Sequence, residues 1–294
     1  MRRRDFLALS ATAAVNAQSL PFPIIDTHIH LFDPTRPQGV PWPPKDNVDL
    51  YWPATPERYR HLTEPFGIRG AIEVECSPWL EDNQWVLNVA AKDKIIVGTV
   101  GNLEPGKPEF GNQLERFHRN SRFRGIRYGN LWDRDLAAQI TKAAFISDLK
   151  LLSDAGLVLD TANPDARLVR AMIATANAVP DLRIVADHLP QFDCPDDLLR
   201  ALSQCPNVFV KISQVLRRVD GRVPTDLAFY RARIDRVFEA FGENRVLYGS
   251  DWPNCDQWGT YATVFNLVRE YFMAKGRPVA EKYFSKNARA VYKV

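Results

Sequence analysis

Two histidines lie two residues apart in Asp26-Thr27-His28-Ile29-His30, directly after the apolar run Pro23–Ile25. In an extended strand, side chains two residues apart point to the same side, so His28 and His30 can present two imidazoles to one cation. The apolar run places both residues at the carboxyl end of a buried strand. This spacing therefore predicts a pair of metal ligands.

Two further polar residues also end apolar segments. His188 follows Ile184–Asp187, and Asp251 follows Val246–Ser250. The chain has only five histidines, and three of them fall at the ends of expected strands. A carboxylate at such a position can ligate a metal, accept a proton from water, or do both. We predict one site in which His28, His30, His188 and Asp251 bind a metal, with His188 and Asp251 also catalytic.

Eight short apolar segments rich in β-forming residues recur along the chain, and nearly all are followed by a helical pattern. They are Pro23–His28, Gly70–Cys76, Ile95–Asn102, Phe123–Tyr128, Leu157–Thr161, Leu182–His188, Val208–Ser213 and Arg245–Asp251. The amphipathic stretches between them include Asn83–Asp93, Leu136–Ala155, Asp165–Ala178, Asp226–Phe241 and Tyr261–Ala274. This alternation predicts a (β/α)8 (TIM) barrel, whose active site is built at the carboxyl ends of the strands.

The first connection after a strand, residues 32–65, is long and rich in proline, and it contains Trp42, Tyr51 and Trp52. Long connections in compact domains are usually functional or disordered. This one either forms a wall or lid over the pocket, with Trp52 as a candidate substrate contact, or is a surface excursion that caps the barrel.

Three cationic residues are candidates for binding an anionic group of the substrate. Arg127 ends a strand, and its guanidinium can bind a carboxylate or sulfonate through two hydrogen bonds. The alternative is an arginine buried against Glu75 or Asp160. Lys211 and Arg217 are secondary candidates near the seventh strand, although Arg217 can equally belong to a solvated loop.

Glu73 and Glu75 alternate with apolar neighbours in Ala71–Cys76. Residues two apart share one face of a strand, so we expect both carboxylates to point into the barrel. Glu75 is the nearer to the carboxyl end. It is a candidate metal ligand or substrate contact, or a carboxylate that only fills the interior.

The first residues are typical of a targeting segment. Arg3-Arg4-Asp5-Phe6-Leu7 is a twin-arginine pattern, and an apolar stretch of small residues follows it up to Val15. Cleavage after Ala17 would leave a single domain, residues 18–294. We expect export to the periplasm; a frayed basic terminus on a cytoplasmic protein is the alternative.

Composition limits the classes of partner. The formal net charge is +3, and the arginines at the start supply most of it, so we expect no binding to nucleic acid or to an anionic membrane. No later apolar run approaches the roughly 20 residues that a membrane span needs. Cys194 and Cys205 flank one expected helix and can be bridged or be buried free thiols.

Six short pieces, spread in order over nearly the whole chain, match the motifs of a known superfamily. They are Ile25–His30, Gly125–Arg127, Asp187-His188, Val210–Ser213, Gly249–Pro253 and Asn287–Arg289. On these pieces the chain resembles the amidohydrolase superfamily, in particular its branch of pyrone dicarboxylate, sulfomuconolactone and sugar-acid lactonases. The resemblance implies that His28, His30 and His188 bind a metal or polarise a carbonyl, and that Asp251 is the base.

The same resemblance bears on the number of metals. Binuclear members carry a bridging carboxylated lysine or a glutamate near strands four and five, followed by a histidine; here those strands end with Arg127-Tyr128 and Asp160-Thr161. One divalent ion at most is implied, with Zn2+ expected, and some relatives work without a metal. Glu75 stands where the lactonase branch has an amide, which leaves its role open.

We therefore expect a hydrolase that opens a small lactone, or a similar ester, by attack of an activated water. The alternative is a non-oxidative decarboxylase of an aromatic or muconate-type acid. That branch usually has a second catalytic histidine, whereas Leu189–Phe192 follow His188 here. A third reading is an exported binding protein that has lost turnover, against which the intact Asp251 argues. The expected partner is a small, anionic substrate; the oligomeric state is open.

Overall fold

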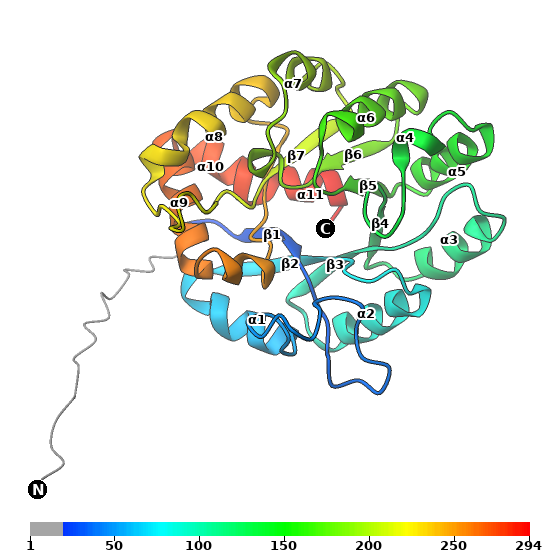
Figure 1. Ribbon diagram of the computed structural model, residues 1–294, viewed down its shortest axis with the longest axis horizontal. Coiled ribbons are helices and arrows are strands. Elements are labelled where there is room, and N and C mark those ends of the chain that lie inside the picture. The colour runs from blue at the N-terminus through cyan, green and yellow to red at the C-terminus, as the bar shows by residue number, and fades with distance from the viewer. Residues whose placement is uncertain (1–19) are drawn as a thin grey trace, which may run out of the picture.

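The computed structural model describes residues 20–294, and the expected targeting segment lies outside them. Eight parallel strands follow one another around a barrel in chain order, as predicted (Figure 1). They are β1 (Ile24–Ile29), β2 (Ile68–Val74), β3 (Ile96–Gly101), β4 (Phe123–Arg127), β5 (Val158–Thr161), β6 (Arg183–Ala186), β7 (Val208–Ile212) and β8 (Val246–Tyr248). The (β/α)8 prediction is confirmed.

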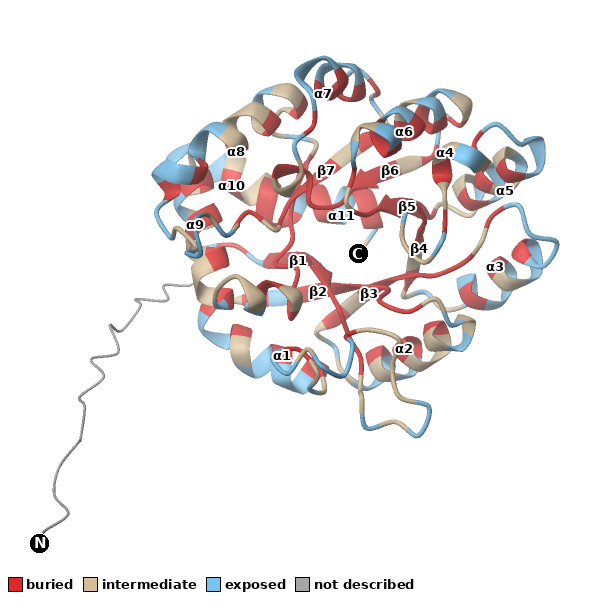
Figure 2. Cartoon of the chain, viewed as in Figure 1, coloured by how far each residue is buried: buried red, intermediate tan, exposed pale blue. Residues whose placement is uncertain are grey.

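Helices surround this barrel, and their inner faces pack against the strands while their outer faces are exposed (Figure 2). They are α1 (Pro56–Thr63), α2 (Leu80–Lys92), α3 (Phe110–His118), α4 (Leu136–Gln139), α5 (Ala143–Asp154), α6 (Ala166–Ala178), α7 (Asp196–Ser203), α8 (Leu227–Phe241), α9 (Tyr261–Ala274) and α10 (Arg277–Glu281). The last helix, α11 (Asn287–Tyr292), lies instead at one end of the barrel. No helix within residues 20–294 is both long and apolar enough to span a bilayer.

Local sequence explains where these helices begin and which face they bury. In α6 the side chain of Asp165 accepts a hydrogen bond from the backbone N–H of Leu168, a cap that stabilises a helix by about 1 kcal/mol. Leu168, Met172 and Ala176 follow at helical spacing and are buried against the strands. Fully burying a leucine or methionine side chain contributes about 1.5–3 kcal/mol.

The helices differ from the sequence-based expectation in two places. The chain expected as one helix over residues 136–155 is divided into α4 and α5, because the backbone of Lys142 is extended. The first connection contains α1, which Thr55 caps and Pro56 begins. Only the chain before α1 is a long loop, and backbone hydrogen bonds between Phe32 and Ala54 join its two ends.

The barrel closes between β1 and β8, where the backbone N–H of Asp251 donates to the carbonyl of His28 over 2.8 Å. At the opposite end, α11 fills the barrel: Val291 and Tyr292 pack against inward side chains such as Ile72 and Val158. The carboxyl end of the barrel is therefore left for a site. All four cysteines are buried free thiols in this structure, so Cys194 and Cys205 are not bridged.

Candidate active site

The structure brings the four predicted site residues together at the carboxyl end of the barrel. His28 lies in β1 and His30 follows it, while His188 and Asp251 follow β6 and β8. Oδ1 of Asp251 lies 3.2 Å from Nε2 of His30, 3.4 Å from Nε2 of His28 and 3.7 Å from Nε2 of His188. Three imidazole nitrogens therefore surround one carboxylate oxygen.

The neighbours of the site residues fix this geometry. Oδ2 of Asp251 accepts hydrogen bonds from the amides of Gln214 and Asn254, so Oδ1 is turned toward the histidines. Nδ1 of His30 lies 2.7 Å from the carbonyl oxygen of Val74. In each residue one polar atom is held by a neighbour, so the other atom, Oδ1 of Asp251 or Nε2 of His30, points into the cluster.

His188 and the seam between β1 and β8 are held in a similar way. Nδ1 of His188 lies 2.8 Å from Oγ of Ser213. Oδ1 of Asp26 accepts from the backbone N–H groups of His28 and Ser250, and its Oδ2 accepts from the hydroxyl of Tyr59. Burial raises the pKa of Asp26 to about 6. Asp26 thus positions the strand ends that carry His28 and Asp251.

A cavity of about 400 Å³ opens above this cluster. It is lined by His30, Trp42, Cys76, Arg127, Leu131, Trp132, Ala162, Asn163, His188, Gln214, Asp251 and Asn254. Five of these residues have left-handed backbone with φ between 48° and 63°: Trp132, Asn163, His188, Gln214 and Asp251. Such conformations cost about 1–3 kcal/mol away from glycine, and they are concentrated at functional sites.

Burial sets the charges of the cluster. It lowers the pKa of His188 to about 4, and together with the charge of Lys211 it lowers the pKa of His28 well below its usual value. Burial alone would raise the pKa of Asp251, but the neighbouring imidazoles, that of His188 foremost, outweigh it and lower that pKa. At neutral pH the neutral imidazoles of His28 and His188 therefore lie beside the carboxylate of Asp251.

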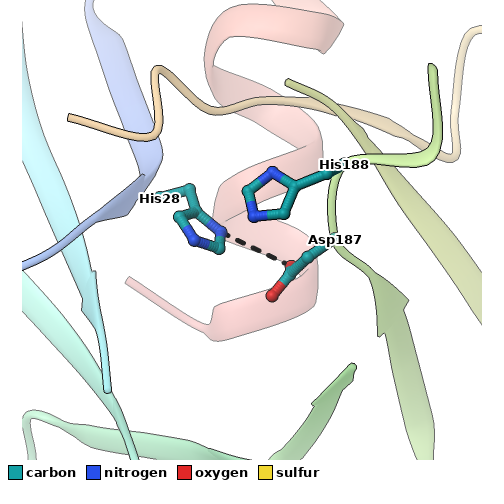
Figure 3. Close-up of side chains that lie close together, drawn as sticks. All are labelled: His28, Asp187 and His188. Carbon is teal, nitrogen blue, oxygen red and sulfur yellow. Dashed lines mark ion pairs between the residues drawn. The ribbon is translucent and has the colours of Figure 1, made fainter. Parts of the chain in front are cut away.

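This donor set fits a divalent metal. Nε2 of His28 and Oδ1 of Asp251 are buried and accept or donate no hydrogen bond within residues 20–294. Two groups of three residues in the described chain place their ligand atoms within 4.8 Å of one another: His28, His30 and Asp251, and His28, Asp187 and His188. Figure 3 shows the second group, with His28 turned toward Asp187. Neutral imidazole and carboxylate are ligands that zinc accepts.

Glu75 lies in neither of these groups. Its Oε1 accepts from Nε of Arg127 over 2.9 Å, and its Oε2 accepts from Nε1 of Trp132 over 3.0 Å. Of the alternatives for Arg127, the ion pair with Glu75 is the one formed, although Arg127 also lines the cavity. Glu73 does not point into the barrel: it lines a separate space beside Asn83 and Val86 of α2, because Ile72 and Val74 occupy the inner face of β2.

The other predicted substrate contacts lie elsewhere. Trp52 is 62% exposed and does not line the cavity; its indole N–H donates to the carbonyl of Val48. Arg217 packs over the ring of Phe229. Lys211 is fully buried below the cavity, where it contacts Asp160. The structure thus brings none of these three side chains to the cavity wall.

Sequence reasoning missed several residues that the structure places at the site. Trp132, Asn163 and Gln214 lie in loops, and Asn254 begins a short 3-10 helix after β8, so the spacing of residues in the sequence carries no information on where these side chains point. An asparagine such as Asn163 tolerates left-handed backbone and is a weak signal for such a turn. Trp42 was singled out with its loop, and it lies edge-on to His30.

Comparisons with known proteins identify relatives of this chain. The chain is 28% identical over 242 residues to an L-fucono-1,5-lactonase of Burkholderia ambifaria, a match that covers 78% of this chain and 80% of that protein. It is 26% identical over 264 residues to an L-fucono-1,5-lactonase of Burkholderia multivorans, covering 84% and 88%.

A solved structure has the same fold. It is an amidohydrolase from Burkholderia multivorans with bound zinc, which superposes with a TM-score of 0.83 at 22% identity and covers 93% of this chain and 100% of that one. The Amidohydrolase family profile matches residues 25–294, which include every residue of the site. The chain belongs to the amidohydrolase family.

Proposed function

We propose that this protein hydrolyses a small lactone. The observation that carries the proposal is the position of Asp251, whose Oδ1 faces three imidazoles at the floor of a cavity of about 400 Å³. A buried carboxylate held in its charged form can act as a base toward a water molecule bound beside it. The two L-fucono-1,5-lactonases support a cyclic ester as the substrate.

The reaction balances with this set of residues. Asp251 accepts a proton from water as the water oxygen bonds to the lactone carbonyl carbon. The ring C–O bond then breaks, and Asp251 returns the proton to the departing alkoxide, which gives one hydroxy acid. A divalent metal, when bound by the histidines and Asp251, would stabilise negative charge on the carbonyl oxygen. His30 and His188, which line the cavity, orient the carbonyl.

The cavity favours a neutral, hydroxylated lactone over an anionic one. Arg127 is the one cationic residue among those that line it, and its charge is already paired with Glu75. Trp42 and Trp132 offer apolar faces to a sugar ring, and the amide of Asn163 can bind hydroxyl groups. This departs from the anionic substrate that the sequence alone predicted.

A panel of lactones tests the proposal. Neutral aldono-1,4- and 1,5-lactones are compared with lactones that carry a carboxylate, and acid release is followed with a pH indicator; elemental analysis gives the metal content. We expect turnover of neutral sugar lactones with higher kcat/KM than of the carboxylated ones. Release of carbon dioxide from an aromatic acid, without opening of any lactone, would identify the decarboxylase alternative instead.

We also propose that the protein works in the periplasm after twin-arginine export. The pattern Arg3-Arg4 supports this, and the residues concerned precede the described chain. Expression of the full chain in a bacterium followed by cell fractionation tests it, with Arg3→Lys and Arg4→Lys combined as the matched variant. Periplasmic protein in the wild type and retention of the variant are expected; equal cytoplasmic retention of both contradicts export.

A further inference from the structure

Trp132 lies between two cavities at the carboxyl end of the barrel. The first is the active-site cavity, and the second, also of about 400 Å³, is formed by the connections after β3 and β4 together with α4 and α5. Among residues 20–294, Trp132 is the one residue that lines both cavities. Leu131 before it lines only the active-site cavity, and Asp133 and Arg134 after it line only the second. The side chain of Trp132 therefore forms the partition between them.

A buried carboxylate holds the indole of Trp132. Nε1 of Trp132 donates to Oε2 of Glu75 over 3.0 Å, and Glu75 is only 4% exposed. The same carboxylate accepts from Nε of Arg127 at Oε1 over 2.9 Å, and from the backbone N–H of Ser77 at Oε2 over 3.0 Å. Because both oxygens of Glu75 are fixed by other residues, the carboxylate cannot move with the indole, and Trp132 keeps one orientation.

The backbone at Trp132 is strained. Trp132 and Asp133 are consecutive residues in the left-handed region, with φ of 59° and 58°. Residues other than glycine rarely adopt this conformation, and it persists only where surrounding contacts impose it. Here the backbone N–H of Arg134 donates to the carbonyl of Leu131 over 3.0 Å, and its guanidinium donates to the carbonyl of Arg127 over 3.2 Å. Such strain is concentrated at sites that clamp a ligand, so the turn supports a role of Trp132 in binding.

The second cavity has the polar lining that a sugar ring needs. Tyr128 contributes an aromatic face, and the amide of Gln139 can both donate and accept hydrogen bonds. The charged residues of this lining nearly balance, with three cations and two carboxylates: Lys107, Arg134, Lys142, Glu104 and Asp133. A hydroxylated ring without net charge can donate to and accept from such a lining, whereas an apolar group would leave the polar atoms without partners.

We propose that Trp132 is a specificity-determining residue, which restricts the substrate to a lactone of one ring by closing the active-site cavity toward the second cavity. Under the proposed function, on which this inference rests, the lactone ring packs against one face of the indole, but a second sugar ring attached on that side collides with it. Rejection by a fixed obstacle is a general route to specificity. Without the indole the two cavities would join, and the second ring would reach Tyr128 and Gln139.

Substrates of graded size test this role. Wild type, Trp132→Ala and Trp52→Ala are compared on single-ring aldono-1,5-lactones and on aldobiono-1,5-lactones whose second sugar is linked at O2, O3, O4 or O6. We expect wild-type kcat/KM to be at least about 100-fold higher on the single-ring lactones. In Trp132→Ala, kcat/KM on at least one disaccharide lactone should rise at least about tenfold, while that on single-ring lactones falls because an aromatic contact is lost.

Trp52→Ala is the matched control and should keep the wild-type preference, because its indole is 62% exposed and lines neither cavity. A gain on larger substrates cannot result from general loss of structure, which would lower the turnover of every lactone. Wild-type hydrolysis of a disaccharide lactone as fast as of a single-ring one would overturn the proposal. So would a folded Trp132→Ala that gains on none of the four linkages. Trp132→Leu, which retains an apolar side chain, replaces the alanine variant if circular dichroism shows that the latter is unfolded.

Binding of the products separates this proposal from the proposed function. Isothermal titration calorimetry with aldonic and aldobionic acids requires no turnover. We expect wild type to bind only the single-ring acids, and Trp132→Ala to bind an aldobionic acid as well. This result without hydrolysis of any lactone would support the role of Trp132 and contradict the lactonase. Hydrolysis of single-ring lactones with an unchanged preference in Trp132→Ala would overturn the role of Trp132 alone, and absence of both binding and hydrolysis would overturn both.

Discussion

Oδ1 of Asp251 lies 3.2 Å from Nε2 of His30, although the two residues come from the last and the first strand regions of the barrel. They are neighbours because β8 closes against β1, where the N–H of His30 donates to the carbonyl of Trp252 over 2.8 Å. Asp251, the proposed base, and His30 are therefore positioned by the same hydrogen bonds that close the fold. Changes to either side chain can be tested without disturbing that backbone contact.

Asp251→Asn should abolish most turnover while leaving the fold intact. The amide has nearly the same shape and keeps the place of the carboxylate between the histidines, but it cannot accept a proton from water. We expect kcat on a lactone substrate to fall by at least about 10²–10⁴-fold, the usual contribution of a positioned base. The measurement is steady-state kinetics, with circular dichroism to confirm folding.

Asp256→Asn is the matched control for this prediction. Asp256 lies five residues further along the same connection, and its side chain is 30% exposed and pairs with Arg58. Its kcat should stay within about twofold of the wild type, since surface changes away from a site are usually nearly neutral. Full activity in Asp251→Asn would exclude Asp251 as the base.

Gln214→Leu should lower kcat only through its effect on the position of Asp251. Nε2 of Gln214 donates to Oδ2 of Asp251, and without this bond the carboxylate is free to rotate away from the histidines. We expect kcat to fall about tenfold, in line with the loss of one hydrogen bond to a charged group. Because the amide acts through the base, adding Gln214→Leu to Asp251→Asn should cause no further loss. Additive losses would show a separate role for Gln214.

The sequence predicted two kinds of feature: the barrel, from the repeated alternation of strands and helices, and the site residues, from their positions at the carboxyl ends of the strands. Each strand is an apolar run, and in parallel strands the carboxyl ends meet at one end of the barrel. This sufficed to bring His28, His30, His188 and Asp251 together from segments far apart in the chain. The prediction needed only strand order, not the course of any loop.

The predictions that failed depend on how deep in the barrel a side chain lies and on the conformation of the loops. Arg127 is the last residue of β4, whereas Lys211 comes one residue before the end of β7, and its ammonium lies below the cavity, paired with Asp160 and Asp187. Sequence alone does not show how far along the barrel axis a side chain reaches. Gln214 faces Asp251 only because its φ of 48° turns the chain, which no composition signal predicts for a glutamine.

The ion pair between Glu75 and Arg127 should matter strongly for stability, because each side chain neutralises the buried charge of the other. Both side chains are at most 6% exposed, so removing one partner leaves a buried charge. We expect Glu75→Gln and Arg127→Met each to lower the free energy of unfolding by about 3–5 kcal/mol, and the double variant to lose less than the sum. Urea unfolding of the three variants measures the coupling.

An exposed pair provides the comparison. Arg116 and Glu81 lie 2.7 Å apart, but their side chains are 44% and 69% exposed. The corresponding two single variants and double variant of this exposed pair should give a coupling free energy below about 1 kcal/mol, because water screens the charges. Equal coupling in the two pairs would mean that Arg127 is not compensated by Glu75, and a carboxylated substrate would then become the better candidate for that arginine.

The buried histidine His188 should make the metal-free protein less stable as the pH falls. Burial lowers its pKa to about 4, whereas an unfolded histidine titrates near 6.5. Between these values the unfolded chain binds a proton that the folded chain does not, so the free energy of unfolding decreases from pH 6.5 toward pH 4. Over the whole interval this one group accounts for about 3 kcal/mol.

Two carboxyl groups change the stability in the opposite direction. The test must therefore compare the pH dependence of unfolding in the wild type with that in a variant that lacks His188. Burial raises the pKa values of Asp26 and Asp160 to about 6, and each therefore favours the folded state as the pH falls from 6. His188→Asn removes the histidine titration, keeps an amide within reach of Ser213 and leaves both carboxyl groups in place. Chelator-treated wild type should then lose more stability than this variant between pH 6.5 and 4.5. His61→Asn, at an exposed position of α1, should follow the wild-type curve. Parallel curves for wild type and His188→Asn would mean that His188 is as easily protonated in the folded protein as in the unfolded one.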